Sequence, residues 1–121
     1  MGNIEVLVVE WLNTFSGGYP ASGNKPKSTP DKYILVDRTG GPRESMVLDR
    51  AEILIEVYDK TSRLDASNKA NAIADVIVQL EAYDENITHA SINSVVNLDD
   101  TITQFNRYQV YCDVYYRRTS E

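Results

Sequence analysis

Between residues 4 and 15 the apolar positions follow the repeat of a single helix face. They stand at i, i+3, i+4, i+7, i+8 and i+11, while Glu5 and Glu10 fall off the stripe: Ile4, Leu7, Val8, Trp11, Leu12 and Phe15. The spacing predicts an amphipathic helix over 4–15. Several of its residues are β-branched valines, which weaken helix propensity, so a strand is the alternative.

Two later stretches are predicted to be strands. Residues 33–38 form a short strand, and residues 51–58 alternate with a period close to 2, which places Ala51, Ile53, Ile55 and Val57 opposite a mostly polar side that Leu54 interrupts. Gly40, Gly41 and Pro42 lie between them. The pattern predicts a hairpin in which at least one of the two glycines has a positive φ, and in which Pro42 keeps the tip an open loop.

A second helix is predicted from Ser62 to about Tyr83. Ser62 followed by Asp65 approximates a capping box, and the carboxylate of Asp65 suits a helix N-terminus. One face of this helix is apolar and rich in alanine, which allows a close approach to a sheet: Ala66, Ala70, Ile73, Ala74, Ile77 and Leu80.

Two further strands complete the pattern. In 88–97, Ala90, Ile92, Ser94 and Val96 alternate with Ser91, Asn93 and Val95. In 107–118, Tyr108, Val110, Cys112, Val114 and Tyr116 face one way, and Gln109, Tyr111, Asp113, Tyr115 and Arg117 face the other. The predicted order α-β-β-α-β-β indicates an α+β fold with an antiparallel-rich, four-stranded sheet and two helices.

The chain of 121 residues is predicted to be a single domain, 1–121. Residues 16–32 are predicted to form a long, flexible loop. This segment combines turn-forming residues with lysines: Gly17, Gly18, Pro20, Gly23, Lys25, Pro26, Lys27, Pro30 and Lys32. A loop of such length in a compact domain is usually functional or disordered.

The composition argues against a nucleic-acid-binding face. Twelve basic and eighteen acidic residues give a net charge of −6, whereas affinity for DNA comes largely from lysine and arginine at the phosphates. Eight tyrosines stand beside one tryptophan and two phenylalanines. Because tyrosine has an apolar ring and a polar tip, this bias suits half-buried surfaces such as interfaces.

The sequence offers little for catalysis. His89 is the single histidine, and we expect it to be a solvated side chain because no nucleophile lies near it in sequence. Cys112 is the single cysteine and falls on the apolar face of the last strand, where we expect an inert buried thiol. No P-loop, dinucleotide fingerprint or calcium-loop pattern occurs. We therefore expect no enzyme activity, cofactor or metal.

Taken as a whole, the chain resembles the tail terminator and tail-completion proteins of siphophages, which are long-tailed bacteriophages. The resemblance rests on the N-terminal helix with Trp11-Leu12, the glycine- and proline-rich loop, Arg38-Thr39-Gly40-Gly41, Leu48-Asp49-Arg50 before a long strand, the capped helix 62–80 and the tyrosine-rich strand 107–118. It implies a non-enzymatic virion protein, assembled in the host cytoplasm, that forms a ring, typically hexameric, at the head-proximal end of the tail tube.

The resemblance implies that this ring stops tail-tube polymerisation and joins the tail to the head. Its partners would be further copies of itself, the tail tube protein and the head connector. No membrane and no specific nucleic acid are expected, although DNA would pass through the ring. The residues we expect at the contacts combine the hairpin arginines and glycines with the outward side of the last strand: Arg38, Gly40, Gly41, Arg43, Arg50, Tyr111, Tyr115 and Arg117.

Two alternatives share the size and composition of this chain. One is a small α+β ligand-binding or regulatory module with a cleft between helices and sheet. The other is a related head-closure or connector protein.

Overall fold

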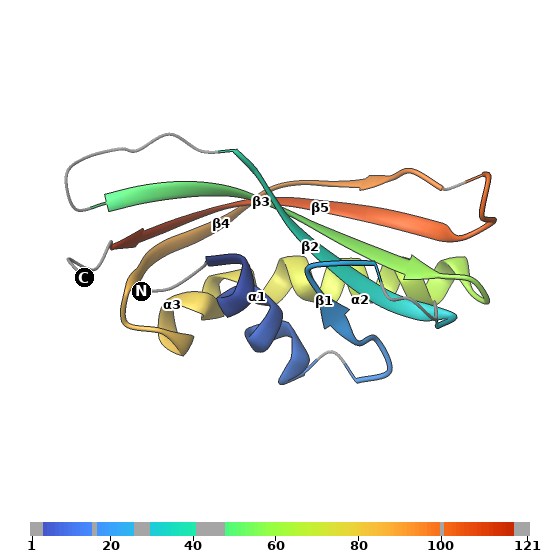
Figure 1. Ribbon diagram of the computed structural model, residues 1–121, viewed down its shortest axis with the longest axis horizontal. Coiled ribbons are helices and arrows are strands. Elements are labelled where there is room, and N and C mark those ends of the chain that lie inside the picture. The colour runs from blue at the N-terminus through green and yellow to red at the C-terminus, as the bar shows by residue number, and fades with distance from the viewer. Residues whose placement is uncertain (1–3, 16, 26–29, 41–47, 100, 118–121) are drawn as a thin grey trace.

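The structure is a computed structural model, and it describes residues 4–15, 17–25, 30–40, 48–99 and 101–117, with Leu48 described by its backbone alone. The described helices all lie on one face of a single β-sheet (Figure 1). In chain order the elements are α1 (Ile4–Asn13), β1 (Ala21–Ser22), β2 (Lys32–Gly40), β3 (Leu48–Asp59), α2 (Arg63–Val76), the 3₁₀ helix η1 (Ile77–Gln79), α3 (Leu80–Tyr83), β4 (Ile87–Asn97) and β5 (Asn106–Arg117).

The predicted four-stranded sheet was wrong, because the sheet has five strands in the order β1-β2-β3-β5-β4 and is mixed. The additional strand β1 lies inside the predicted loop 16–32 and runs parallel to β2, with Ala21 opposite Ile34. Asn13 holds β1 in place, since its side chain donates to the Ala21 carbonyl (3.1 Å) and accepts from the Ala21 N–H (3.0 Å). A strand of two residues is too short to show an alternation of apolar and polar residues in the sequence. Residues 26–29 of the predicted loop lie outside the described residues.

The predicted first helix is confirmed, and the strand alternative for this segment is excluded. In α1 the residues Ile4, Leu7, Val8, Trp11 and Leu12 are buried against the sheet. The helix ends at Asn13, and Phe15, the last residue of the predicted stripe, remains 38% exposed. Phe15 meets the Trp11 ring edge-on, with ring centres 4.9 Å apart.

The predicted second helix forms as three consecutive pieces. Ser62 caps α2 as expected, because its hydroxyl accepts a hydrogen bond from the Asp65 N–H (3.0 Å). At Val76 the chain leaves α geometry and passes through η1 into α3. The β-branched run Val76, Ile77 and Val78 explains the break, since such side chains crowd the preceding turn of a helix. Ala66, Ala70, Ile73, Ile77 and Leu80 still face the core.

In the sheet order β2-β3-β5-β4, each pair of neighbouring strands is antiparallel. The register of these pairs determines which side chains lie on the same face of the sheet. Val36 lies opposite Ile55, and Ile55 lies opposite Val110, so the apolar positions of β2, β3 and β5 form one buried surface beneath the helices. The core comprises this surface and the inward stripes of the helices: Val8, Leu12, Ile34, Val36, Ile53, Ile55, Val57, Ile73, Ile77, Leu80, Val110 and Val114.

The predicted face assignment in β4 was wrong beyond Ala90. The ladder to β5 shifts register between Ile87 and His89 and again between Ile92 and Ser94. Because a one-residue shift moves the following side chains to the other face, Val95 packs against the core while Val96 is 42% exposed. Sequence periodicity alone does not reveal where a bulge falls.

The hairpin between β2 and β3 is partly described. Gly40 ends β2 and pairs with Glu52 after a register shift from Arg38. Its φ lies outside the left-handed region, so a positive φ at Gly40 is not observed, whereas Gly18 has φ +82°. Gly41, Pro42 and Arg43 lie outside the described residues.

Candidate interaction surface

The face of the sheet opposite the helices carries half-buried tyrosines. Tyr111 lies opposite Leu54 across the β3–β5 ladder, and Tyr115 lies opposite Arg50. Both tyrosines are partly exposed, while Val110, Cys112 and Val114 on the other side of β5 are fully buried. The predicted facing of Tyr111 and Tyr115 is therefore confirmed. No described helix covers this face (Figure 1).

A chain of polar contacts orders the middle of this face. The Tyr111 hydroxyl donates to Gln109 Oε1 (3.2 Å), and Gln109 Nε2 donates to Glu56 Oε2 (3.1 Å). Arg107 Nη1 lies 3.6 Å from the same carboxylate oxygen and donates to the Tyr58 hydroxyl (3.4 Å). Connected contacts of this kind restrict side-chain rotation, so a partner would meet a preformed surface.

Aromatic side chains cover one end of the face within the monomer. Tyr33 stacks on Tyr58 with ring centres 4.5 Å apart, and Phe105 from the β4–β5 connection meets the Tyr33 ring edge-on at 5.5 Å. Burial raises the pKa of Tyr58, against the opposing hydrogen bond from Arg107. Since this small core closes one end, Tyr111 and Tyr115 mark the more accessible part of the face.

Three of the predicted contact residues meet at the hairpin end of the face. Arg50 lies opposite Tyr115 and its Nη2 is 3.9 Å from Glu52 Oε1, while the exposed Arg117 follows on β5 opposite Leu48. Tyr111 lies two residue pairs further along the same face.

Arg38 is separated from this group, because it pairs with Ile53 on the helix side of the sheet. Its guanidinium donates to the Tyr116 hydroxyl (3.1 Å), the Gly40 carbonyl (3.2 Å) and the Arg50 carbonyl (3.4 Å). These bonds tie β2 to β3 and β5, so we assign Arg38 a structural role at the base of the hairpin. Gly40 lies beside it at the end of β2. The predicted contacts at Gly41 and Arg43 fall outside the described residues.

His89 and Cys112 occupy the environments of structural residues. His89 lies on β4, is exposed as expected, and places Nδ1 3.5 Å from Glu81 Oε1 of α3. Cys112 is buried, and its thiol donates to the Ile53 carbonyl (3.6 Å). Burial, with a smaller contribution from the charge of Asp113, raises the pKa of Cys112 to about 12. A thiol with such a pKa is a poor nucleophile at neutral pH.

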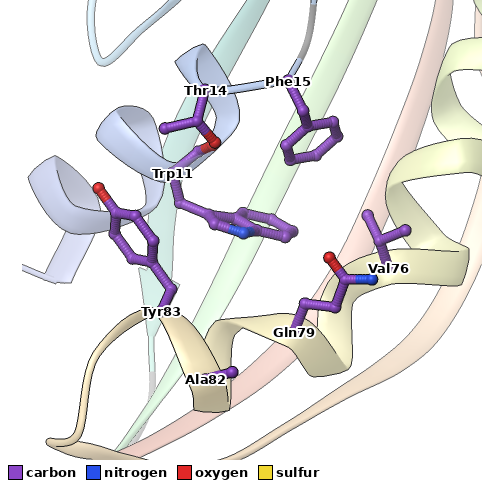
Figure 2. Close-up of a pocket in the computed structure, with 7 residues that line it drawn as sticks. All are labelled: Trp11, Thr14, Phe15, Val76, Gln79, Ala82 and Tyr83. Atoms are coloured by element: carbon purple, nitrogen blue, oxygen red, sulfur yellow. The ribbon is translucent and has the colours of Figure 1, made fainter.

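Two grooves run beside α1, and sequence reasoning did not predict them. The first, of about 480 Å³, lies between the end of α1 and the segment η1–α3, where Trp11, Phe15, Gln79 and Tyr83 converge (Figure 2). The second, of about 320 Å³, is lined by Glu5, Val6, Val9, Glu10, Gly23 and Asn24. The sequence offered no signal for the first groove, because the predicted helix 4–15 included Phe15, whereas α1 ends at Asn13.

A buried carboxylate at Asp59 was also missed. Asp59 Oδ1 accepts from the Thr61 N–H and hydroxyl (both 2.9 Å) and from the Ser62 N–H (3.0 Å), and Oδ2 accepts from the Tyr19 hydroxyl. Burial opposes ionisation, but these hydrogen bonds outweigh it and hold the pKa of Asp59 below its usual value. The motif Asp59-Lys60-Thr61-Ser62 is a sequence signature for such an Asx turn.

Within the described part of the chain, no group of three or more His, Cys, Asp or Glu side chains is arranged to hold a metal ion. None of the helices described here is long and apolar enough to cross a membrane. Neither a protein-family model nor a curated protein matches this chain.

Proposed function

We propose that this protein is a structural virion subunit that assembles with copies of itself into a ring, as in the siphophage tail terminators that its sequence resembles. In that role the ring, typically hexameric, stops growth of the tail tube and joins the tail to the head connector. The proposed setting is the phage tail, assembled in the host cytoplasm, with no catalytic step and no cofactor.

The observation that carries this proposal is the helix-free face of the sheet. It holds Tyr115 beside Arg50, with Tyr111 fixed by Gln109, and it is neither fully buried nor purely polar. Tyrosine and arginine are enriched in protein interfaces because each combines apolar area with directional hydrogen bonding. A head-to-tail contact that uses such a face on one side closes into a ring when its rotation closes.

The net charge is consistent with a ring around DNA. A lumen of negative potential keeps passing DNA from adhering, and the chain has six more acidic than basic residues. We therefore expect the ring lumen to be acidic and expect no specific binding of nucleic acid.

The proposal is tested by light scattering after gel filtration, followed by negative-stain microscopy. We expect closed rings from the wild type, and at least tenfold weaker association for Tyr111→Ala/Tyr115→Ala. Asn68→Ala, an exposed change on α2, is the control and should assemble normally. A folded wild type that stays monomeric at high concentration, or rings with a basic lumen, would contradict the proposal. A monomer that binds a small apolar ligand in the groove beside Trp11 would instead support the ligand-binding alternative.

A further inference from the structure

The side chain of Trp11 lies at the base of the first groove with its indole N–H unpaired. The residue is only 3% exposed, yet among the described residues no atom accepts a hydrogen bond from the indole nitrogen. A buried tryptophan usually finds a partner for this donor. The nitrogen is not enclosed by the core, because the ring lines the groove, and Figure 2 shows the nitrogen on the edge of the ring that faces the η1–α3 segment. The groove therefore holds a preformed donor that a ligand can use.

The walls of the groove come from two parts of the chain that the fold brings together. α1 contacts α3, and the segment at its end contributes Trp11 and Phe15, whose rings meet edge-on. The other wall contains Val76, Gln79 and Ala82, which stand at every third residue from the end of α2 through η1 into α3. A 3₁₀ helix has three residues per turn, so the first two of these side chains are aligned, and Ala82 continues the row. The break in the second helix thus shapes this wall.

The lining of the groove determines which chemistry it accommodates. None of the described residues that line it is charged, so a charged ligand would lose water there without gaining an ionic partner. The Thr14 hydroxyl is already used, because it donates to the Trp11 carbonyl (2.6 Å). The side chain of Gln79 is exposed and makes no hydrogen bond to another described residue, so its amide offers a donor and an acceptor at the rim. The volume of about 480 Å³ and the mostly apolar lining suit a small molecule.

We propose that the first groove binds a neutral, planar aromatic molecule that accepts a hydrogen bond from the Trp11 indole N–H through an acceptor in the plane of its ring. The aromatic side chains of Phe15 and Tyr83 supply the apolar contacts, and the Gln79 amide meets a polar group at the open edge of the molecule (Figure 2). This site does not depend on the proposed ring. The groove lies in the helical layer, whereas the tyrosines of the proposed contact lie on the opposite face of the sheet (Figure 1).

Two bicyclic probes of similar size test the hydrogen bond. Quinoline carries a ring nitrogen that accepts a hydrogen bond in the ring plane, whereas 1-methylindole has neither such an acceptor nor an N–H, and both are neutral at pH 7.5. Trp11 is the single tryptophan, so one indole N–H signal in a proton–nitrogen NMR spectrum reports on the groove, and the backbone N–H of Ala82 gives a second signal. We expect quinoline to shift both signals saturably. We expect 1-methylindole to bind about fivefold more weakly, which corresponds to the net contribution of one hydrogen bond.

Three variants locate the binding. Ala82→Leu fills the groove from an exposed position on α3 and should abolish the quinoline-induced shift of the indole signal. Ala72→Leu is the matched control, because Ala72 is exposed on α2 and does not line the groove. Trp11→Phe keeps an aromatic ring and removes the donor, so quinoline should then bind no more tightly than 1-methylindole, as read from the Ala82 signal. Circular dichroism and urea unfolding establish that each variant is folded. If Trp11→Phe is not, the two probes on the wild type and on Ala82→Leu still decide.

The outcomes separate this site from the proposed function. The absence of a saturable shift at millimolar quinoline, equal affinity for the two probes, or unchanged binding by Ala82→Leu would each overturn the site. Light scattering of the same samples measures assembly independently. Rings that bind neither probe leave the ring proposal standing and remove the site. A folded monomer that binds quinoline through Trp11 supports the site and contradicts the ring.

Discussion

The hydroxyl of Tyr19 donates a hydrogen bond of 2.5 Å to Oδ2 of Asp59, which is fully buried. The bond joins the segment after α1 to the end of β3, forty residues later in the chain. Lys32 Nζ of β2 lies 3.7 Å from the same carboxylate, and the side chain of Asn106 at the start of β5 donates to the Asp59 carbonyl (2.9 Å). Asp59 thus connects three strands and the N-terminal end of α2 at one point.

Asp59→Ala should lower the free energy of unfolding more than Tyr19→Phe, which removes the other partner of the same hydrogen bond. Asp59→Ala leaves several donors without an acceptor, and unsatisfied buried groups cost about 1–3 kcal/mol each. Tyr19→Phe removes one donor and should cost about 1–2 kcal/mol, because the carboxylate keeps its other hydrogen bonds. Urea unfolding measures both, with exposed Asp75→Ala as the control. Equal stability of Asp59→Ala and the wild type would contradict the assigned role.

Acid should weaken the protein partly through Asp59. Its pKa is lowered by folding, so the folded state favours the ionised form. The stability this provides is complete above the unfolded pKa of about 4 and is lost as the pH falls through the folded pKa. Asp59→Asn should therefore be less stable than the wild type at pH 7, and the difference should shrink as the pH falls below 4. Urea midpoints between pH 7 and pH 2.5 provide the comparison, and a constant difference would contradict this account.

Two glycines should respond differently to alanine. Gly18 has φ +82° with open space where a Cβ would stand, so Gly18→Ala should cost about 1–2 kcal/mol from the backbone alone. At Gly40 the added Cβ would lie 3.2 Å from Glu52 Oε2, the end of a flexible side chain, and φ is not left-handed. We expect Gly40→Ala to change stability by less than about 1 kcal/mol. Thermal unfolding of the pair tests this order, and a larger loss at Gly40 would reverse it.

The Cys112 thiol should be inert in the folded protein. Its pKa of about 12 and its burial leave almost no accessible thiolate at pH 8. Labelling by an aromatic disulfide reagent should be slow in buffer and fast in denaturing urea, following the population of unfolded protein. Rapid labelling without unfolding would show that β5 opens locally. The exposed variant Ser94→Cys in a Cys112→Ala background provides the fast-reacting control.

The spacing of apolar residues along the sequence predicted the long helices and strands correctly, because each of them buries one regular face. The stripe from Ile4 to Leu12 and the alternation from Val110 to Tyr116 are both found in the core. Periodicity did not locate β1, because this strand is held by two hydrogen bonds between Asn13 and Ala21 and by pairing with β2 rather than by a hydrophobic repeat. Nor did it locate the bulges of β4, because both faces of that strand carry apolar side chains.

The candidate surface could be predicted only in part. The alternation of β5 correctly placed Tyr111 and Tyr115 away from the core, because strand geometry is local. The position of Arg38 in the sequence, close to the hairpin, did not reveal which face of the sheet its side chain lies on. That face depends on the register with β3 and on the hydrogen bond to the Tyr116 hydroxyl, which is distant in sequence.

The two register shifts in β4 bear on how the protein behaves at high concentration. β4 lies at the edge of the sheet, is eleven residues long, and leaves Ile92 and Val96 exposed. A straight strand of this kind would be a template for open-ended aggregation, as in cross-β fibrils. The shifts at His89 and Ser94 interrupt its row of backbone donors and acceptors, so they favour solubility over fibril growth.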